Sequence, residues 1–192
     1  RQVRILRNAD AKLMITFAEM ERTATLLTAQ TPSLNAVVTV SQLTETGHEL
    51  TAVSPLHRLR NSHTDREPAL IQYTSGSTDQ PKGVLLSHAN LLANIRALAT
   101  RLDIGAEDVG VSWLPLYHDM GLIGAWLSSM YTGIPVVILS PLTFLSRPAR
   151  WLWAIHAHQA TVSVAPNFAF DLCVNKIRND EIDGLDLGTL KV

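Results

Sequence analysis

The sequence predicts an α/β fold in which layers of a mainly parallel sheet are flanked by helices. Two observations carry this prediction. Short apolar runs rich in valine, isoleucine and leucine alternate with stretches of helical periodicity, as in folds built from successive strand–helix units. The strand runs are apolar almost throughout, which is typical of parallel strands that are covered by helices on both faces.

Each expected element follows from its local pattern. The expected strands cover residues 12–16, 35–40, 69–73, 84–86, 109–114, 135–139 and 161–165. Helical periodicity predicts one helix that closes within 3–6 and others over 18–29, 90–102, 120–131, 146–158 and 168–177. Ser146 would cap the helix over 146–158, with Pro148 in its first turn. The polar stretch 41–68 is expected to be a surface connection.

The composition describes a globular chain that is more apolar than usual. Its 192 residues could bury the core of one domain, with 46% hydrophobic residues, 17% charged residues and a net charge of −1. The sequence has no excess of basic residues that would indicate binding to nucleic acid. The lone Cys173 rules out an internal disulfide, is expected to be a small core residue, and fits a reducing compartment, the cytoplasm.

Residues 120–146 carry no charged side chain over a length that could span a bilayer. Gly133, Pro135 and Pro141 interrupt this segment, and the apolar run 136–139 is short and β-branched. We therefore interpret it as a buried helix, a turn and a buried strand, and expect no transmembrane segment.

The run 73–83, Tyr-Thr-Ser-Gly-Ser-Thr-Asp-Gln-Pro-Lys-Gly, lies between two expected strands. Its backbone N–H groups and hydroxyls can donate to phosphate oxygens, and Lys82 supplies a positive charge, although a solvated turn has a similar composition. The nucleotide loop of P-loop NTPases needs glycine directly before the lysine and Ser or Thr directly after it. Pro81 and Gly83 occupy those positions, so this class of loop is excluded.

The order Thr-Ser-Gly-Ser-Thr-x-x-Pro-Lys-Gly instead resembles the phosphate-binding loop of the adenylate-forming, or AMP-binding, enzymes. These include acyl-CoA synthetases, peptide-synthetase adenylation domains and fatty acyl-AMP ligases. One departure is Asp79, where most members carry glycine. The resemblance implies ATP and Mg²⁺ as cofactors, with the ATP phosphates held by Thr74, Ser75, Gly76, Ser77, Thr78, Lys82 and Gly83.

A second run, Trp-Leu-Pro-Leu-Tyr-His-Asp-Met-Gly-Leu over 113–122, follows an expected strand and opens an expected helix. Loops in this position meet ligands in α/β proteins, although Asp119 could simply cap the helix and His118 could simply face water. The spelling most resembles that of the fatty acyl-AMP ligases. That resemblance places the acyl or carboxylate end of the substrate beside His118, Asp119, Met120, Gly121 and Leu122.

A third run, Pro-Asn-Phe-Ala-Phe-Asp over 166–171, allows Asn167 to cap the next helix and Phe168 and Phe170 to be core residues. It is also similar to an acyl-site run of the fatty acyl-AMP ligases, which implies that Asn167 and Phe168 contact the acyl group. The resemblance covers nearly the whole chain, most specifically residues 72–175.

Two other kinds of site are not expected. His156 and His158 are two residues apart on an expected helix and therefore point to different faces, which makes them a poor metal pair. The chain has no Gly-x-Ser-x-Gly run that would mark a serine nucleophile. His48, His57 and His63 lie in the polar connection and are expected to be solvated.

The resemblance implies a partial N-terminal AMP-binding domain over 1–192, with no complete second domain and with the catalytic lysine outside this chain. The implied protein is a fatty acyl-AMP ligase. It would form an acyl-adenylate and transfer the acyl group to the thiol of an acyl carrier protein or polyketide synthase. Two alternatives stay open. One is an acyl-CoA synthetase or adenylation domain, and the other is an inactive phosphate-binding or docking module, which Asp79 favours slightly.

Overall fold

The computed structural model describes residues 2–46, 65–74 and 82–191. The chain forms two compact units, Arg1–Ala89 and Asn90–Val192, and each has its own arrangement of helices and strands. The expected positions His48, His57 and His63 lie outside the described residues.

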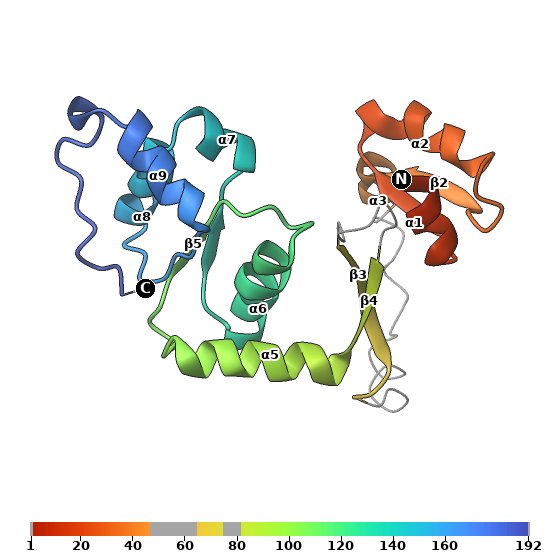
Figure 1. Ribbon diagram of the computed structural model, residues 1–192, viewed down its shortest axis with the longest axis horizontal. Helices are drawn as coiled ribbons and strands as arrows, with labels where there is room; N and C mark the ends of the chain where they lie inside the picture. The colour runs from red at the N-terminus through yellow and green to blue at the C-terminus, as the bar shows by residue number, and fades with distance from the viewer. Residues whose placement is uncertain (1, 47–64, 75–81, 192) are drawn as a thin grey trace. The chain divides into compact units, whose positions relative to one another are not determined.

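The first unit contains a parallel strand pair joined by a crossover helix (Figure 1). β1 (Leu13–Thr16) pairs with β2 (Ala36–Thr39), from Leu13 opposite Ala36 to Thr16 opposite Thr39. The crossover consists of η1 (Ala18–Met20) and α2 (Glu21–Thr28), and α1 (Gln2–Asn8) precedes β1. Ala24 on α2 is buried, as the apolar periodicity of this segment predicts.

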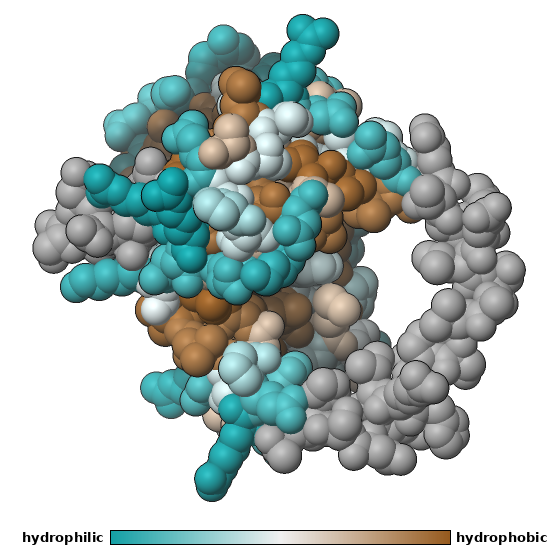
Figure 2. All heavy atoms as spheres, turned by 90° about the vertical axis from the view of Figure 1, so that its right-hand side faces the viewer, coloured by the Kyte–Doolittle hydropathy of each residue, from teal (hydrophilic) through white to brown (hydrophobic). Residues whose placement is uncertain are grey.

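Apolar side chains also reach the surface of this unit. Leu13, Ile15 and Phe17 alternate along the chain and therefore share one face, and they are 49%, 56% and 68% exposed. Figure 2 shows brown, apolar atoms between hydrophilic ones on one face of the molecule.

The expected surface connection begins instead with a helix, α3 (Val40–Thr46). The Thr39 N–H donates to Gln42 Oε1 at 2.8 Å, and the Gln42 N–H donates to Thr39 Oγ1 at 3.3 Å. These reciprocal bonds form a capping box, which satisfies two N–H groups that a helix start leaves unpaired. The prediction that residues 41–46 are a connection was therefore wrong.

β3 (Pro68–Thr74) and β4 (Lys82–Ser87) form an antiparallel hairpin in the same unit. The second unit is assembled around a short parallel pair, β5 (Gly110–Ser112) and β6 (Val136–Ile138). Helices α5 (His88–Arg101), η3 (Met120–Leu127), α6 (Ser128–Thr132), α7 (Pro141–Ser146), α8 (Ala149–Ala157), α9 (Asn167–Lys176) and η4 (Asn179–Glu181) complete the described elements. The α/β class is confirmed, with short parallel pairs and one antiparallel hairpin.

Two local predictions were wrong, and one open alternative, a cap by Asn167, is not found. The segment 161–165 is not a strand, because only Val162 pairs with β5, through a single parallel bridge to Gly110. Ser146 ends α7 and donates to the Thr143 carbonyl, whereas Ser140 caps α7 by accepting from the Leu142 N–H at 3.3 Å. Asn167 is the first residue of α9 and, among the described residues, makes no side-chain cap there.

The core of the second unit is centred on aromatic side chains. Phe144 on α7 is stacked on Trp113, with ring centroids 3.9 Å apart and an interplanar angle of 12°. Trp151 on α8 meets both rings edge-on, at 6.2 Å and 5.6 Å. Cys173 is partly buried against this cluster, as expected for a core residue, and burial raises the pKa of its thiol.

A buried carboxylate ties two distant parts of the second unit together. Asp108 is 1% exposed, and its Oδ1 accepts from Lys191 Nζ at 2.8 Å and from Thr161 Oγ1 at 2.6 Å. The Gly105 N–H donates to Oδ2 at 2.8 Å. The hydrogen bonds from Lys191, Thr161 and Gly105 lower the pKa of Asp108 from 3.8 to about 2.

The Asp108→Asn variant is expected to lose stability above pH 3.8. Because the pKa of Asp108 is lower in the folded than in the unfolded chain, its carboxylate stabilises the fold fully above pH 3.8, and the contribution is lost as the pH falls through about 2. Thermal unfolding of both proteins across this range should show their difference shrinking toward low pH. Asp183→Asn, at an exposed position of the same unit, is the control. A difference independent of pH would contradict this assignment.

None of the helices in the described ranges is long and apolar enough to cross a membrane.

Candidate functional site

The expected phosphate loop begins and ends on paired strands of the first unit. Thr74, the last residue of β3, lies opposite Lys82, the first residue of β4. Antiparallel partners have Cα atoms about 5 Å apart, so the two ends of the loop are held together by the ladder. Both residues are exposed. The other predicted contacts of this loop, Ser75, Gly76, Ser77 and Thr78, lie outside the described residues.

Gly83 follows Lys82 on β4, and the Tyr73 ring lies close to the place that a side chain at this position would occupy. A Cβ atom at this position would be 3.1 Å from Tyr73 Cε1 and 2.9 Å from Ile71 Cγ2. The Tyr73 hydroxyl donates to Asn8 Oδ1 at 2.5 Å, which fixes the ring in that place. Gly83 therefore has a packing reason within the hairpin, and its predicted contact with phosphate stays a prediction.

The second predicted group of residues lies in the other unit, where the chain turns from β5 into η3. His118 Nδ1 lies 2.6 Å from Asp119 Oδ1, which also accepts from the Met120 N–H at 2.8 Å. His118 Nδ1 also accepts a long hydrogen bond from the Met120 N–H, at 3.4 Å. Asp119 caps η3, as its position in the sequence suggests, and the side chains of His118 and Asp119 are 61% and 63% exposed.

Gly121 is required by the way this turn is folded. A Cβ atom on Gly121 would lie 2.3 Å from the Pro115 carbonyl oxygen and 2.9 Å from that of Leu114. Both atoms belong to the backbone and cannot rotate away. The His118 N–H donates to the same Pro115 oxygen at 3.0 Å, so the absence of a side chain at Gly121 lets the turn close over the start of η3.

The helix that follows is a π-helix over Met120–Leu127. At its C-terminal end, the Ser128 N–H donates to the Ile123 carbonyl, five residues earlier, and Ser128 Oγ donates to the same carbonyl at 2.8 Å. π-helical turns are rare in proteins, and those that occur are frequently found at functional sites. The sequence analysis predicts a helix here but has no signal for this type.

Phe168 is brought to the second group of residues through Trp113. Their ring centroids are 6.0 Å apart with the planes at 72°, and Phe168 is 52% exposed while Trp113 is 3% exposed. Trp113 comes just before the Leu114–Pro115 backbone that packs on Gly121. The runs 113–122 and 166–171 thus meet at one aromatic residue, which the sequence analysis did not single out as a site residue.

Two polar features bear on ligands. Trp113 Nε1 is buried and has no hydrogen-bond partner among the described residues. Within the same residues, no group of three or more His, Cys, Asp or Glu side chains could hold a metal ion.

A family model for AMP-binding enzymes matches residues 1–192. The chain belongs to the AMP-binding enzyme family. This AMP-binding chain is 42% identical over 124 residues to the medium-chain-fatty-acid–[acyl-carrier-protein] ligase TtuA of Teredinibacter turnerae, covering 65% of this chain and 19% of the relative. It is 46% identical over 125 residues to the long-chain-fatty-acid–AMP ligase FadD26 of Mycobacterium marinum, covering 62% and 21%.

A solved structure extends the likeness to almost all of the AMP-binding chain. The fatty acyl-adenylate ligase from L. pneumophila, in complex with acyl adenylate and pyrophosphate, has a TM-score of 0.76 and 36% sequence identity, covering 98% of this chain and 31% of that one. The α/β fold class is thereby confirmed. The chain spans about a fifth of the length of the two curated relatives.

Proposed function

We propose that the full-length protein containing this chain joins a fatty acid to ATP, forming an acyl-adenylate and pyrophosphate. The observation that carries the proposal is the 42% and 46% identity to two relatives that are both named as fatty-acid ligases. The residues 1–192 would then be a partial N-terminal domain of that enzyme. We further propose the cytoplasm as its location, because a lone cysteine suits a reducing compartment.

In the proposed reaction, a carboxylate oxygen of the fatty acid attacks the α-phosphorus of ATP. A new bond forms between that oxygen and phosphorus, and the bond from phosphorus to the bridging oxygen breaks, so that pyrophosphate leaves with its electron pair. The enzyme must align the carboxylate and stabilise negative charge on the leaving group. Mg²⁺ bound to the phosphate oxygens would supply part of that stabilisation.

Lys82 and Thr74 are the described residues that suit the phosphate end. A lysine ammonium is a strong point charge for phosphate, and the hairpin holds its backbone directly opposite Thr74. The carboxylate and acyl end would lie against the turn 118–122 and against Asn167 and Phe168. Support for this assignment comes from the Asp119 cap, the close packing of Gly121 and the contact of Phe168 with Trp113.

Lys82→Ala is expected to reduce ATP–pyrophosphate exchange by the full-length protein about a hundredfold, because it removes the positive charge that would stabilise the leaving phosphates. Lys82→Arg should retain more activity. Lys12→Ala is the matched control, since Lys12 is an exposed lysine of the same unit that pairs with Asp10 at 2.8 Å. Equal exchange rates for Lys82→Ala and wild type would remove Lys82 from the proposed site.

The acceptor of the acyl group can be tested on the full-length protein with ATP, Mg²⁺ and a medium-chain fatty acid. Product identification by mass spectrometry, with and without coenzyme A, separates the outcomes. Acyl-adenylate that persists with coenzyme A supports transfer to the thiol of a carrier protein or polyketide synthase, whereas acyl-CoA shows a synthetase. Absence of any product would contradict the proposed reaction.

The isolated chain 1–192 is proposed to be inactive, because the catalytic lysine of the family is expected outside it. Acyl-adenylate formed by the purified 192-residue chain would contradict this part of the proposal.

A further inference from the structure

The side chain of Asn8 connects a helix to the hairpin that carries the predicted phosphate residues. Asn8 is the last residue of α1, and its Oδ1 accepts from the Tyr73 hydroxyl on β3 at 2.5 Å. The two partners are 65 residues apart in the chain. The three runs that resemble those of the fatty acyl-AMP ligases do not include Asn8, so a part for it in the site does not follow from them.

The end of α1 gives this contact a firm support. The Ala11 N–H donates to the carbonyl oxygen five residues earlier at 3.0 Å, and the Asp10 N–H donates to the Arg7 carbonyl at 3.1 Å. Asp10 lies in the left-handed region, at φ 49°. Together these features form a Schellman motif, which closes the last turn of a helix. Arg7 Nε also donates to the Gln30 carbonyl, just after α2, at 2.7 Å. Asn8 therefore extends from a backbone that is held on both sides.

The Tyr73 ring lies across the hairpin, next to the pair that would hold phosphate. Tyr73 is opposite Gly83 in the antiparallel ladder, and the next pair is Thr74 with Lys82. A Cβ atom on Gly83 would be 3.1 Å from Tyr73 Cε1, so the ring fills the space beside the residue that follows Lys82. Aromatic side chains that cover a cross-strand glycine stabilise strand pairing and fix its register. A ring held by Asn8 thus keeps the two strand ends in place.

This support matters because the hairpin is small. Within the described ranges, β3 and β4 form a sheet of two strands. A two-stranded hairpin by itself is marginally stable in water and needs contacts with another element. The bond from Tyr73 to Asn8 is such a contact, and it lies at the end of the hairpin that carries Thr74 and Lys82.

We propose that Asn8 is a positioning residue for ATP, which holds the Tyr73 ring and thereby the strand ends that present Thr74 and Lys82 to the polyphosphate. The inference rests on the proposed function and adds to it a residue that acts through another side chain instead of touching a substrate. Such support contributes to catalysis because a small displacement of binding groups from the productive geometry lowers the rate. Removing either partner of the bond is therefore expected to have the same effect.

The test measures ATP–pyrophosphate exchange by the full-length protein with octanoate, and compares Asn8→Ala, Tyr73→Phe and the double variant with wild type. Each single variant is expected to raise the KM for ATP and for pyrophosphate about threefold to tenfold, the factor that corresponds to one hydrogen bond. The KM for octanoate should stay as in wild type. The double variant should be no worse than either single one, because both changes remove the same bond.

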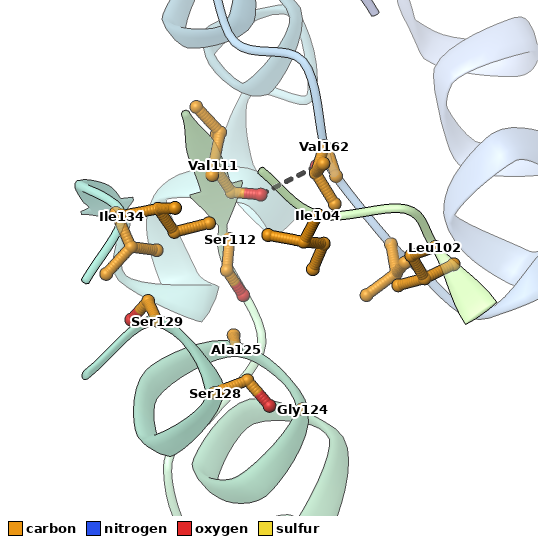
Figure 3. Close-up of a pocket in the computed structure, with 14 residues that line it drawn as sticks. Leu102, Ile104, Val111, Ser112, Gly124, Ala125, Ser128, Ser129, Ile134 and Val162 are labelled. Atoms are coloured by element: carbon orange, nitrogen blue, oxygen red, sulfur yellow. Dashed lines mark hydrogen bonds between the residues drawn. The ribbon is translucent and has the colours of Figure 1, made fainter. Parts of the chain in front are cut away.

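Two controls separate positioning from a general loss of stability. Gln2→Ala removes an exposed amide at the other end of α1 and should leave all three KM values unchanged. Ile134→Val trims a buried side chain at the wall of a small cavity in the second unit (Figure 3). It should lower the thermal transition temperature without changing any KM.

The outcomes separate this inference from the proposed function. If wild type catalyses no exchange, the proposed function fails and this inference fails with it. If wild type is active, Asn8 has no positioning role when the variants keep the KM for ATP, raise all three KM values alike, or lose activity only in proportion to thermal stability. Effects that add in the double variant would also contradict it. If Asn8→Ala does not fold, Tyr73→Phe decides, because it keeps the ring beside Gly83 and removes only the hydroxyl.

Discussion

Gly121→Ala is expected to abolish acyl-adenylate formation by the full-length protein and to destabilise it by about 3 kcal/mol or more. The added Cβ would lie 2.3 Å from the Pro115 carbonyl oxygen, far inside van der Waals contact. Overpacking is tolerated when a flexible side chain can move, but here the obstacle is backbone. Relief requires the 114–118 turn to separate from η3, which would displace His118 and the Asp119 cap together.

Gly124→Ala is a matched control for this variant. It makes the same chemical change three residues later on the same helix, where the new Cβ meets no heavy atom of the described residues within 4 Å. Alanine is favoured over glycine in a helix by about 0.5–1 kcal/mol, so this control should be neutral or slightly stabilising. Acyl-adenylate formation with octanoate and the first thermal transition of the full-length protein are the measurements. If Gly121→Ala had the wild-type rate of acyl-adenylate formation and the wild-type transition temperature, the close approach of Gly121 to Pro115 would not limit stability or activity.

Part of the fold can be predicted because it depends on local patterns. The pairs β1–β2 and β5–β6 follow from apolar runs separated by helical segments, and that order favours parallel pairing. Two missed helices also had local signals. Thr39 and Gln42 have the spacing of a capping box, and Ser140–Pro141 is a common helix start.

Other features depend on partners far away in the sequence. The segment 161–165 has the composition of a strand, but its pairing with β5 stops after one bridge at Val162. Lys191 is 83 residues from Asp108, so no spacing rule connects them. These contacts exist only after the chain has folded, which is why local periodicity does not reveal them.

The candidate site divides in the same way. The hydroxyl-rich run before Lys82 indicates phosphate chemistry by its residue types, whereas the roles of His118 and Phe168 are implied by the resemblance of their runs to those of the fatty acyl-AMP ligases. The reason for Gly121 is geometric, since it depends on where the Pro115 carbonyl lies after the turn has closed. The part played by Trp113 depends on Phe144 and Phe168, which come from different helices.

Phe144→Ala is expected to destabilise the protein by about 3–5 kcal/mol, the usual cost of removing a buried phenylalanine ring. Phe144 is 1% exposed, and its ring is stacked at 3.9 Å on Trp113 and meets Trp151 edge-on. Without it, one face of Trp113 has no packing partner and the indole is free to tilt. Phe168 rests against the same indole. We therefore also expect the KM for the fatty acid to rise more, relative to wild type, than the KM for ATP.

Leu142→Ala provides a control on the same helix, because Leu142 is 75% exposed and its loss should change stability by less than about 0.5 kcal/mol. Phe144→Leu restores apolar volume without the aromatic stack and should recover part of the stability. If Phe144→Leu also restores the KM for the fatty acid, filling the space beneath Trp113 is sufficient to place Phe168. If stability returns and the KM does not, the stacked ring itself fixes the indole. A Phe144→Ala protein whose KM values for both substrates equal those of wild type would separate the aromatic core from the acyl site.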